Sequence, residues 1–214
     1  MLRRFFRALY AAYGPQHWWP GETQFEIIVG AILTQNTAWT NVEKAIARLK
    51  AAGALSVRAM EAIGEPALAE LIRPSGYYNQ KARKLKAFLA WLRDRHAGSL
   101  QRMFRLDTVE LRRELLTLPG IGEETADSIL LYAGDRLVFV VDAYARRILA
   151  RHRLIGGGES YHDIQRLVHH RLPPDAPIYN EFHALLVEAG KRHCRKSAPQ
   201  CAGCPLERFP HGTE

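Results

Sequence analysis

The sequence has few cysteines, no long apolar run and almost no strand-like alternation. Its three cysteines all lie in the last 21 of the 214 residues. An odd, clustered set of this kind excludes a disulfide framework and indicates a reducing compartment and a metal. No stretch approaches the roughly 18 consecutive apolar residues of a membrane span, and the N-terminus lacks the apolar stretch and cleavage site of a signal peptide. We therefore expect a cytoplasmic protein with no membrane association.

What the chain does contain is enough apolar material for a core and a surplus of positive charge. Apolar residues make up 47% of the sequence, which excludes global disorder. Lys and Arg number 30 against 22 Asp and Glu, a formal net charge of +8. Such a surplus favours a polyanionic partner, with nucleic acid ahead of an anionic membrane surface.

Apolar residues recur at helical spacing along most of the chain. Phe5, Phe6, Leu9 and Tyr13 share one face of a predicted first helix. Further helices are predicted over residues 41–51, 82–92, 106–118 and 161–172. The one strand-like run, residues 137–141, is too short and isolated to form a sheet. The fold class is therefore mostly α, as a compact bundle of short helices joined by tight turns.

The most specific local feature is the string LPGIGEETAD over residues 118–127. An apolar helix ends at Leu118, Gly120 and Gly122 make a tight turn, and a new helix follows. Backbone N–H groups at the start of that helix form a site for an anion. A hairpin of this kind can contact one DNA phosphate without reading the base sequence. The alternative is an ordinary tight turn between two helices.

Asp142 stands seventeen residues after Thr125, between an apolar run and an amphipathic helix. The simpler interpretation is a plain N-cap. The functional interpretation uses the same geometry, because a carboxylate at a helix N-terminus prefers to be ionised. Beside a phosphate-binding hairpin, it could stabilise positive charge that develops on a sugar and orient a water molecule.

The hairpin string, the string VVDAY over residues 140–144 and the cysteine-rich tail together resemble the helix-hairpin-helix DNA glycosylases of the endonuclease III superfamily. The resemblance implies an all-α, two-lobed fold. Residues 22–134 would form a six-helix barrel, and residues 1–21 and 135–214 would form a discontinuous helical domain. The similarity is closest to the 3-methyladenine DNA glycosylase III branch. Four strings carry it, over residues 18–20, 30–37, 73–82 and 120–130.

The resemblance also implies a reaction. In the lyase-type members, a lysine at the position of Glu124 forms a Schiff base that leads to strand cleavage. A carboxylate cannot act as that nucleophile. The chain therefore resembles a monofunctional base-excision repair glycosylase, with Asp142 as its catalytic carboxylate. Its partner would be double-stranded DNA with a flipped, damaged base, most simply an N-alkylated purine such as 3-methyladenine.

Roles for DNA-contacting residues follow from the same resemblance. Gln35 would enter the base stack and Tyr77 would press on the opposite strand. Their simpler interpretations are a helix-end amide and a partly buried core aromatic. The hairpin would contact phosphate, together with a monovalent cation, through Gly120, Ile121, Gly122 and Thr125.

A base pocket is also implied. It would comprise aromatic residues, a rigid wall and a carboxylate: Trp18, Trp19, Pro20, Trp39 and Glu124. Aromatic faces attract a cationic alkylated purine by stacking and cation–π contact. Tryptophan is also a common core residue, and we expect at least one of the three to be buried in the core.

The tail spacing Cys194-x6-Cys201-x2-Cys204 is similar to the iron–sulfur loop of the superfamily, but Pro210 stands where the fourth cysteine is expected. Three thiolates could hold a [4Fe–4S] cluster if His211, another ligand or solvent completed it. The cluster could instead have been lost. A zinc site with His211 or His193 is a third interpretation.

Two other functions stay open from the sequence. One is a bifunctional glycosylase and abasic-site lyase for oxidised pyrimidines, which borohydride trapping would reveal. The other is a non-catalytic helix-hairpin-helix module, which would bind DNA without releasing a base. For the preferred interpretation we expect a monomer near the nucleoid, with a lesion range that the sequence does not define.

Overall fold

The computed structural model describes residues 1–212, which are helical with no β-strand. The mostly α fold class is confirmed. The chain divides into two compact units. One comprises Pro20–Gly134, against the predicted 22–134. The other is discontinuous and comprises Met1–Trp19 and the chain from Asp135 onward.

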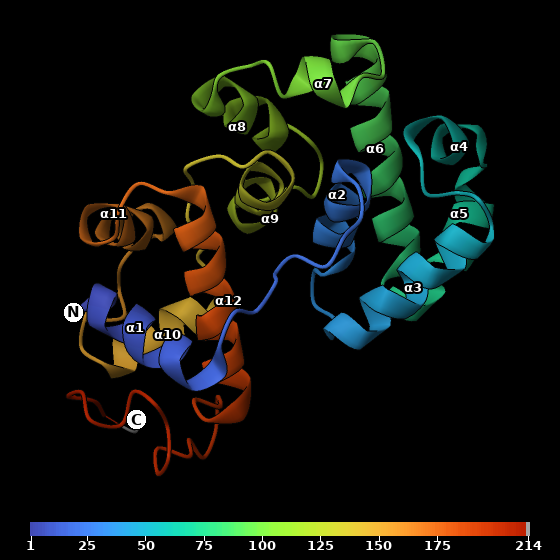
Figure 1. The fold of residues 1–214 in the computed structure, drawn as a ribbon. Helices are drawn as coiled ribbons and strands as arrows, with labels where there is room; N and C mark the ends of the chain where they lie inside the picture. The colour runs from blue at the N-terminus through green and yellow to red at the C-terminus, as the bar shows by residue number, and fades with distance from the viewer. Residues whose placement is uncertain (213–214) are drawn as a thin grey trace. The chain divides into compact units, whose positions relative to one another are not determined.

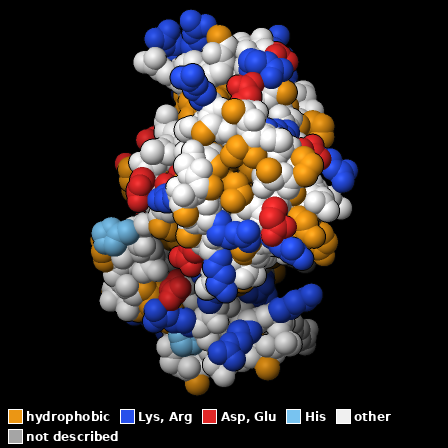
Figure 2. All heavy atoms as spheres, turned by 90° about the vertical axis from the view of Figure 1, so that its right-hand side faces the viewer, with side chains coloured by type: hydrophobic (Ala, Val, Ile, Leu, Met, Phe, Trp, Pro, Cys, Tyr) orange, Lys and Arg blue, Asp and Glu red, His pale blue; other side chains and the backbone are white. Residues whose placement is uncertain are grey.

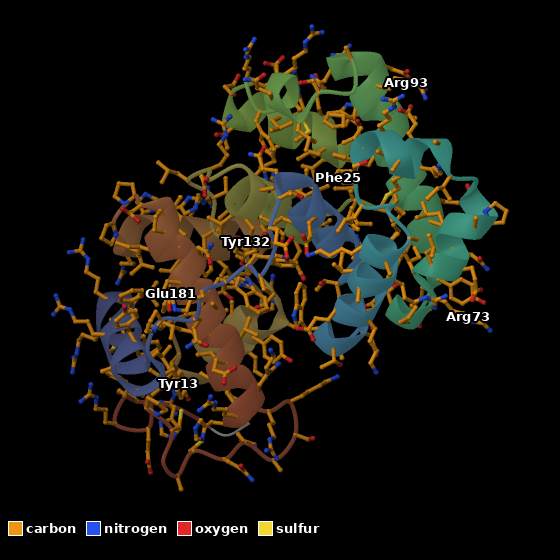
Figure 3. The ribbon with its side chains drawn as sticks, turned by 45° about the vertical axis from the view of Figure 1, so that its right-hand side comes forward. Tyr13, Phe25, Arg73, Arg93, Tyr132 and Glu181 are labelled. Atoms are coloured by element: carbon orange, nitrogen blue, oxygen red, sulfur yellow. The ribbon has the colours of Figure 1, made fainter. Side chains whose placement is uncertain are left out.

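The continuous unit is built around two helices, α2 (Gln24–Leu33) and α6 (Tyr78–His96). Almost every residue of α2 is buried, as its apolar run requires. Helix α2 packs against α6 and η2, where Phe25 and Tyr132 are labelled in Figure 3. The other elements of this unit are α3 (Trp39–Ala51), α4 (Val57–Ala62), α5 (Glu65–Leu71), η1 (Arg73–Ser75), α7 (Leu100–Met103), α8 (Thr108–Leu116), α9 (Glu123–Ser128) and the π-helical η2 (Ile129–Ala133).

The discontinuous unit contains α1 (Leu2–Tyr13), α10 (Ala143–Arg151), α11 (Tyr161–Arg171) and α12 (Ala176–Arg192). Helix α12 packs against both α1 and α10, and the three helices lie together in Figure 1. The rings of Phe139 and Phe182 are buried, with centroids 5.9 Å apart. Helices α10 and α12 approach closely at Gly190, where an added Cβ would overlap the Tyr144 ring.

The predicted helices exist, but their ends differ from the sequence estimates. The first helix is confirmed as α1, with Phe5 and Leu9 buried. The segment predicted over 82–92 is α6, which runs from Tyr78 to His96. Its additional turns are polar, so apolar periodicity could not reveal them. The segment predicted over 106–118 begins later, because the side chain of Asp107 caps α8 by accepting from the N–H groups of Val109 and Glu110.

Candidate active site

Asp142 is the N-cap of α10, as the simpler interpretation of the sequence predicts. Its Oδ1 accepts a hydrogen bond from the backbone N–H of Ala145 at 2.7 Å. Its side chain is 13% exposed. The carboxylate therefore combines a fixed position at the positive end of a helix with some access to solvent.

No sequence pattern indicated a second group at this carboxylate. The imidazole Nε2 of His183, on α12, lies 3.5 Å from Asp142 Oδ2. Burial raises the pKa of the Asp142 carboxyl, but His183 and the N–H groups of Ala145 and Tyr144 outweigh it. The pKa of Asp142 therefore lies below its ordinary value, and the group is ionised at neutral pH.

The hairpin joins α8 to α9 through a tight turn in the continuous unit. Gly120 adopts a φ of 78°, and the N–H of Ile121 donates to the carbonyl of Leu118 at 3.1 Å. Gly122 is the N-cap of α9, whose first turn carries Glu123 and Glu124. Ile121 is buried, so only its backbone is available to a ligand.

Three of the predicted DNA-binding residues meet in one hydrogen-bonded cluster. Gln35 Nε2 donates to the carbonyl of Gly120 at 3.1 Å and to the hydroxyl of Thr125 at 2.9 Å. Its Oε1 accepts from the ammonium group of Lys84 on α6. The Lys84 side chain also crosses Gly120 so closely that an added Cβ would overlap it. Gln35, which follows the C-cap of α2, therefore binds the hairpin through its amide, and its entry into the base stack stays a prediction.

Tyr77 is not a core aromatic, because it is 64% exposed. It stands between Gly76 and the start of α6 with a φ of 46°, in the left-handed region that tyrosine rarely adopts. The turn therefore presents an aromatic ring to solvent. Its exposure agrees with the predicted wedge role, which stays a prediction.

The sequence analysis did not single out Lys81, although it lies in the string RPSGYYNQKA over residues 73–82 that carries part of the family resemblance. It is 2% exposed, and its ammonium donates to the carbonyls of Leu33 at 2.8 Å and Ser75 at 2.7 Å. Leu33 ends α2, two residues before Gln35, and Ser75 ends η1, two residues before Tyr77. One buried lysine thus connects the segments that carry both predicted DNA-contacting side chains. No apolar pattern could have indicated it.

The three tryptophans are all partly exposed, so the expectation that one is a core residue is wrong. Trp18 and Trp19 lie in the discontinuous unit, with ring centroids 5.4 Å apart, and Lys191 Nζ lies 5.8 Å from the Trp18 centroid. Trp39 lies in the continuous unit and donates to Glu43 at 3.0 Å. Pro20 and Glu124 also belong to the continuous unit, so the five predicted pocket residues are divided between the two units. The pocket that they would form stays a prediction.

The cysteine loop surrounds a hollow against α10 and α12. Three thiols and three imidazoles line it, those of Cys194, Cys201, Cys204, His152, His193 and His211. Arg151 donates to Cys194 Sγ at 3.2 Å and to the carbonyls of Arg195 and Lys196. Soft thiolate donors fit an iron–sulfur cluster. Among residues 1–212, no three His, Cys, Asp or Glu side chains are grouped closely enough for a single metal ion.

Lys and Arg side chains are spread over the face drawn in Figure 2. No helix in the described part of the chain is long and apolar enough to cross a membrane.

The family of the chain follows from its sequence. The profile described as "HhH-GPD superfamily base excision DNA repair protein" matches residues 29–174, which include the hairpin and Asp142. The chain belongs to the HhH-GPD superfamily. It is a DNA glycosylase of base excision repair, as the resemblance predicted.

Relatives of this HhH-GPD glycosylase are found among curated proteins and solved structures. A Methanocaldococcus jannaschii protein named as a DNA repair glycosylase is 46% identical over 98% of this chain and 95% of that protein. The 3-methyladenine DNA glycosylase MagIII of H. pylori, solved bound to 1,N6-ethenoadenine, is 30% identical, with a TM-score of 0.78 over 89% of this chain and 97% of that one. An endonuclease III–DNA covalent intermediate, 24% identical with a TM-score of 0.83 over 97% and 93%, shows the same fold.

Proposed function

We propose that this protein is a monofunctional DNA glycosylase that hydrolyses the N-glycosidic bond of a flipped, N-alkylated purine in double-stranded DNA. The observation that carries the proposal is Asp142, an ionised and partly exposed carboxylate fixed at the start of α10. Such a group can stabilise positive charge on the deoxyribose as the bond to the base breaks. It can also orient the water molecule whose oxygen adds to C1′.

The monofunctional mode is supported by Glu124. This position in the first turn of α9 carries a carboxylate, which cannot form a Schiff base with the sugar. An alkylated purine already carries positive charge, so it leaves as a neutral base and needs little acid catalysis. The similarity to a 3-methyladenine glycosylase supports this substrate class. We place Trp18, Trp19, Pro20, Trp39 and Glu124 around the extruded base.

The continuous unit supplies the proposed DNA contacts. The hairpin from Gly120 to Thr125 would bind a backbone phosphate, with Gln35 entering the stack and Tyr77 pressing on the opposite strand. The N–H groups of the turn and the positive charge of Lys84 suit an anionic ligand. In this proposal the enzyme acts as a monomer in the cytoplasm, beside the nucleoid.

For the cysteine loop, we propose a [4Fe–4S] cluster held by Cys194, Cys201 and Cys204, with His211 as the fourth ligand. His211 Nδ1 lies 2.8 Å from the carbonyl of Phe209, a contact that leaves Nε2 for iron. When bound, the cluster would cross-link the loop through its ligands. Iron and sulfide analysis of anaerobically purified protein tests this assignment. His211→Ala should alter the electron paramagnetic resonance spectrum of the reduced cluster, whereas His170→Ala, outside the hollow, should not. Protein without iron contradicts it.

The function itself is tested with a set of duplexes that each carry one lesion. We expect release of 3-methyladenine or another alkylated purine, an abasic-site product and no covalent adduct after borohydride treatment. An adduct would show the bifunctional mode. Tight binding to every duplex without release of any base would show a non-catalytic module.

A further inference from the structure

The discontinuous unit contains a buried histidine that the reaction described above does not use. His183 is 5% exposed and lies on α12 among apolar residues. The Phe139 ring packs against it edge-on, at 6.1 Å between centroids. An apolar side chain could fill this space without the desolvation cost of an imidazole. The carboxylate of Asp142 lies beside the ring, with Oδ2 3.5 Å from Nε2.

The two oxygens of Asp142 face different neighbours. The N–H of Ala145 binds Oδ1 at 2.7 Å, whereas Oδ2 faces His183. The N–H of Tyr144 also donates to the carboxylate, so peptide groups already restrain the carboxylate plane in part. A donor on the second oxygen fixes that plane. The 3.5 Å separation is within ion-pair distance but longer than the about 2.7–3.2 Å of a formed N–H···O hydrogen bond, and such long contacts are common at catalytic groups before the substrate is bound.

We propose that His183 is a positioning residue of the glycosylase, whose Nε2–H donates to Asp142 Oδ2 and keeps the carboxylate oriented and ionised for the reaction. The imidazole can donate this hydrogen bond in its neutral or its protonated form. The inference rests on the proposed role of Asp142 and names a residue that acts through it.

Charged side chains elsewhere on the two helices have other partners. On α12, Glu181 accepts from the N–H of Gln16 at 2.9 Å (Figure 3 labels Glu181), and Glu188 pairs with Arg192. On α10, Arg146 donates to the carbonyl of Glu159 and Arg147 to that of Cys194. Together with the peptide N–H groups of Tyr144 and Ala145, His183 is the group that lowers the pKa of Asp142.

The test compares two substitutions of His183. His183→Phe keeps a planar ring but removes the donor, and His183→Gln keeps an N–H donor without a titratable ring. We expect His183→Phe to reduce the single-turnover rate of base release about 10-fold to 100-fold, with DNA affinity unchanged. The acid limb of its pH–rate profile should also move to higher pH, because the Asp142 carboxyl is protonated more readily without the donor. His183→Gln should recover most of the rate.

A matched control is available in the same unit. His169 stacks on Tyr179, and its Nε2 accepts from the N–H of Phe139 at 3.0 Å, so it is a structural imidazole. His169→Gln should lower stability without moving the acid limb of the pH–rate profile. Should His183→Phe fail to fold, His183→Met, which also lacks a donor, takes its place with the same expected loss of rate. A rate and profile equal to wild type in His183→Phe would overturn the proposal.

A second readout separates this inference from the proposed function. Carboxyl ¹³C resonances of Asp142, assigned with Asp142→Asn, report its protonation without any substrate. We expect the Asp142 titration to move to higher pH in His183→Phe. No movement would refute the inference even in an active enzyme. If the Asp142 titration moves but the wild-type protein releases no base, the contact between His183 and Asp142 is supported and the glycosylase proposal is refuted.

Discussion

The two units fix their important side chains by opposite uses of helix ends. In the discontinuous unit, a negative carboxylate, Asp142, occupies the positive N-terminus of α10. In the continuous unit, positive lysines of α6 bind the negative C-terminal ends of other helices: Lys81 at α2 and η1, and Lys86 at α4. Both arrangements satisfy backbone groups that a helix leaves without partners.

The two arrangements differ in whether the charged side chain itself is the proposed functional group. Asp142 is the proposed reacting group and retains exposure, whereas Lys81 is buried and serves the segments on either side of it. In the proposed function, the reacting group lies at the start of a helix, and the DNA-contacting side chains lie on loops that Lys81 connects. Loss of the charge should abolish the reaction in the first unit but distort geometry in the second.

The largest expected effect is that of Asp142→Asn. The amide keeps the shape of the side chain but not the negative charge opposite the sugar. We expect the rate of base release to fall by roughly two to four orders of magnitude, while DNA affinity is retained. Single-turnover assays with separate binding titrations would measure both. Nearly full activity would exclude Asp142 from the mechanism.

Lys81→Met should have the next largest effect. It removes both hydrogen bonds of the ammonium and leaves the carbonyls of Leu33 and Ser75 buried without this donor. We expect the free energy of unfolding to fall by about 2–4 kcal/mol, and base release to slow about 10-fold because Gln35 and Tyr77 lose their common support. Urea unfolding and single-turnover kinetics would measure the two effects.

Lys86→Met is the matched control for that substitution. Lys86 also lies on α6 and donates to the carbonyls of Met60, Glu61 and Ile63, away from both loops. It should lower stability without changing the rate of base release. If the two lysine variants slowed catalysis equally, the specific role of Lys81 would be wrong.

Lys81 should also make stability depend on pH. Burial, with a smaller contribution from Lys84, lowers the pKa of Lys81 to about 8. An unfolded lysine has a pKa of about 10.4, so between these two pKa values the unfolded chain binds a proton that the folded chain does not. The contribution of Lys81 to the free energy of unfolding therefore increases from about pH 8 to about pH 10. This rise should be absent in Lys81→Met, and an identical pH dependence would contradict it.

A smaller effect is expected for Gly120→Ala. The new Cβ would overlap Lys84 at a φ of 78° and displace the side chain that binds Gln35. We expect a loss of about 1–3 kcal/mol in stability and several-fold weaker DNA binding. Gly53→Ala, at a φ of 62° with open space around it, controls for backbone strain alone. Equal DNA affinity in the two variants would show that Lys84 is not involved.

The smallest expected effect is that of Arg93→Ala. Arg93, labelled in Figure 3, is exposed in the last turn of α6. It pairs with Glu61 and Asp94. Exposed pairs contribute little in water. Thermal unfolding and base release should both match wild type, which would show that α6 matters through the buried Lys81 rather than through its surface charges.

The sequence predicted the helical class, the hairpin and the N-cap geometry of Asp142, because each depends on neighbouring residues. It could not reveal His183 or Lys81. His183 is 41 residues from Asp142, and Lys81 is 48 residues from Leu33, one of its two carbonyl partners, so neither contact shows in a local pattern. The burial expected for a tryptophan was wrong for a related reason, since residue type does not tell how an aromatic is covered.

Gly190 has a consequence for any attempt to redesign this enzyme. It lies opposite Tyr144, two residues after Asp142, and a single methyl group there would have to push the ring aside. The close approach of the α10 and α12 backbones therefore requires a residue without a side chain at position 190. A larger residue at this point of α12 would displace Tyr144 and the start of α10, and with it the carboxylate of Asp142, although it makes no contact with Asp142 itself. Directed evolution of lesion preference should therefore leave position 190 fixed and diversify the loops of the other unit.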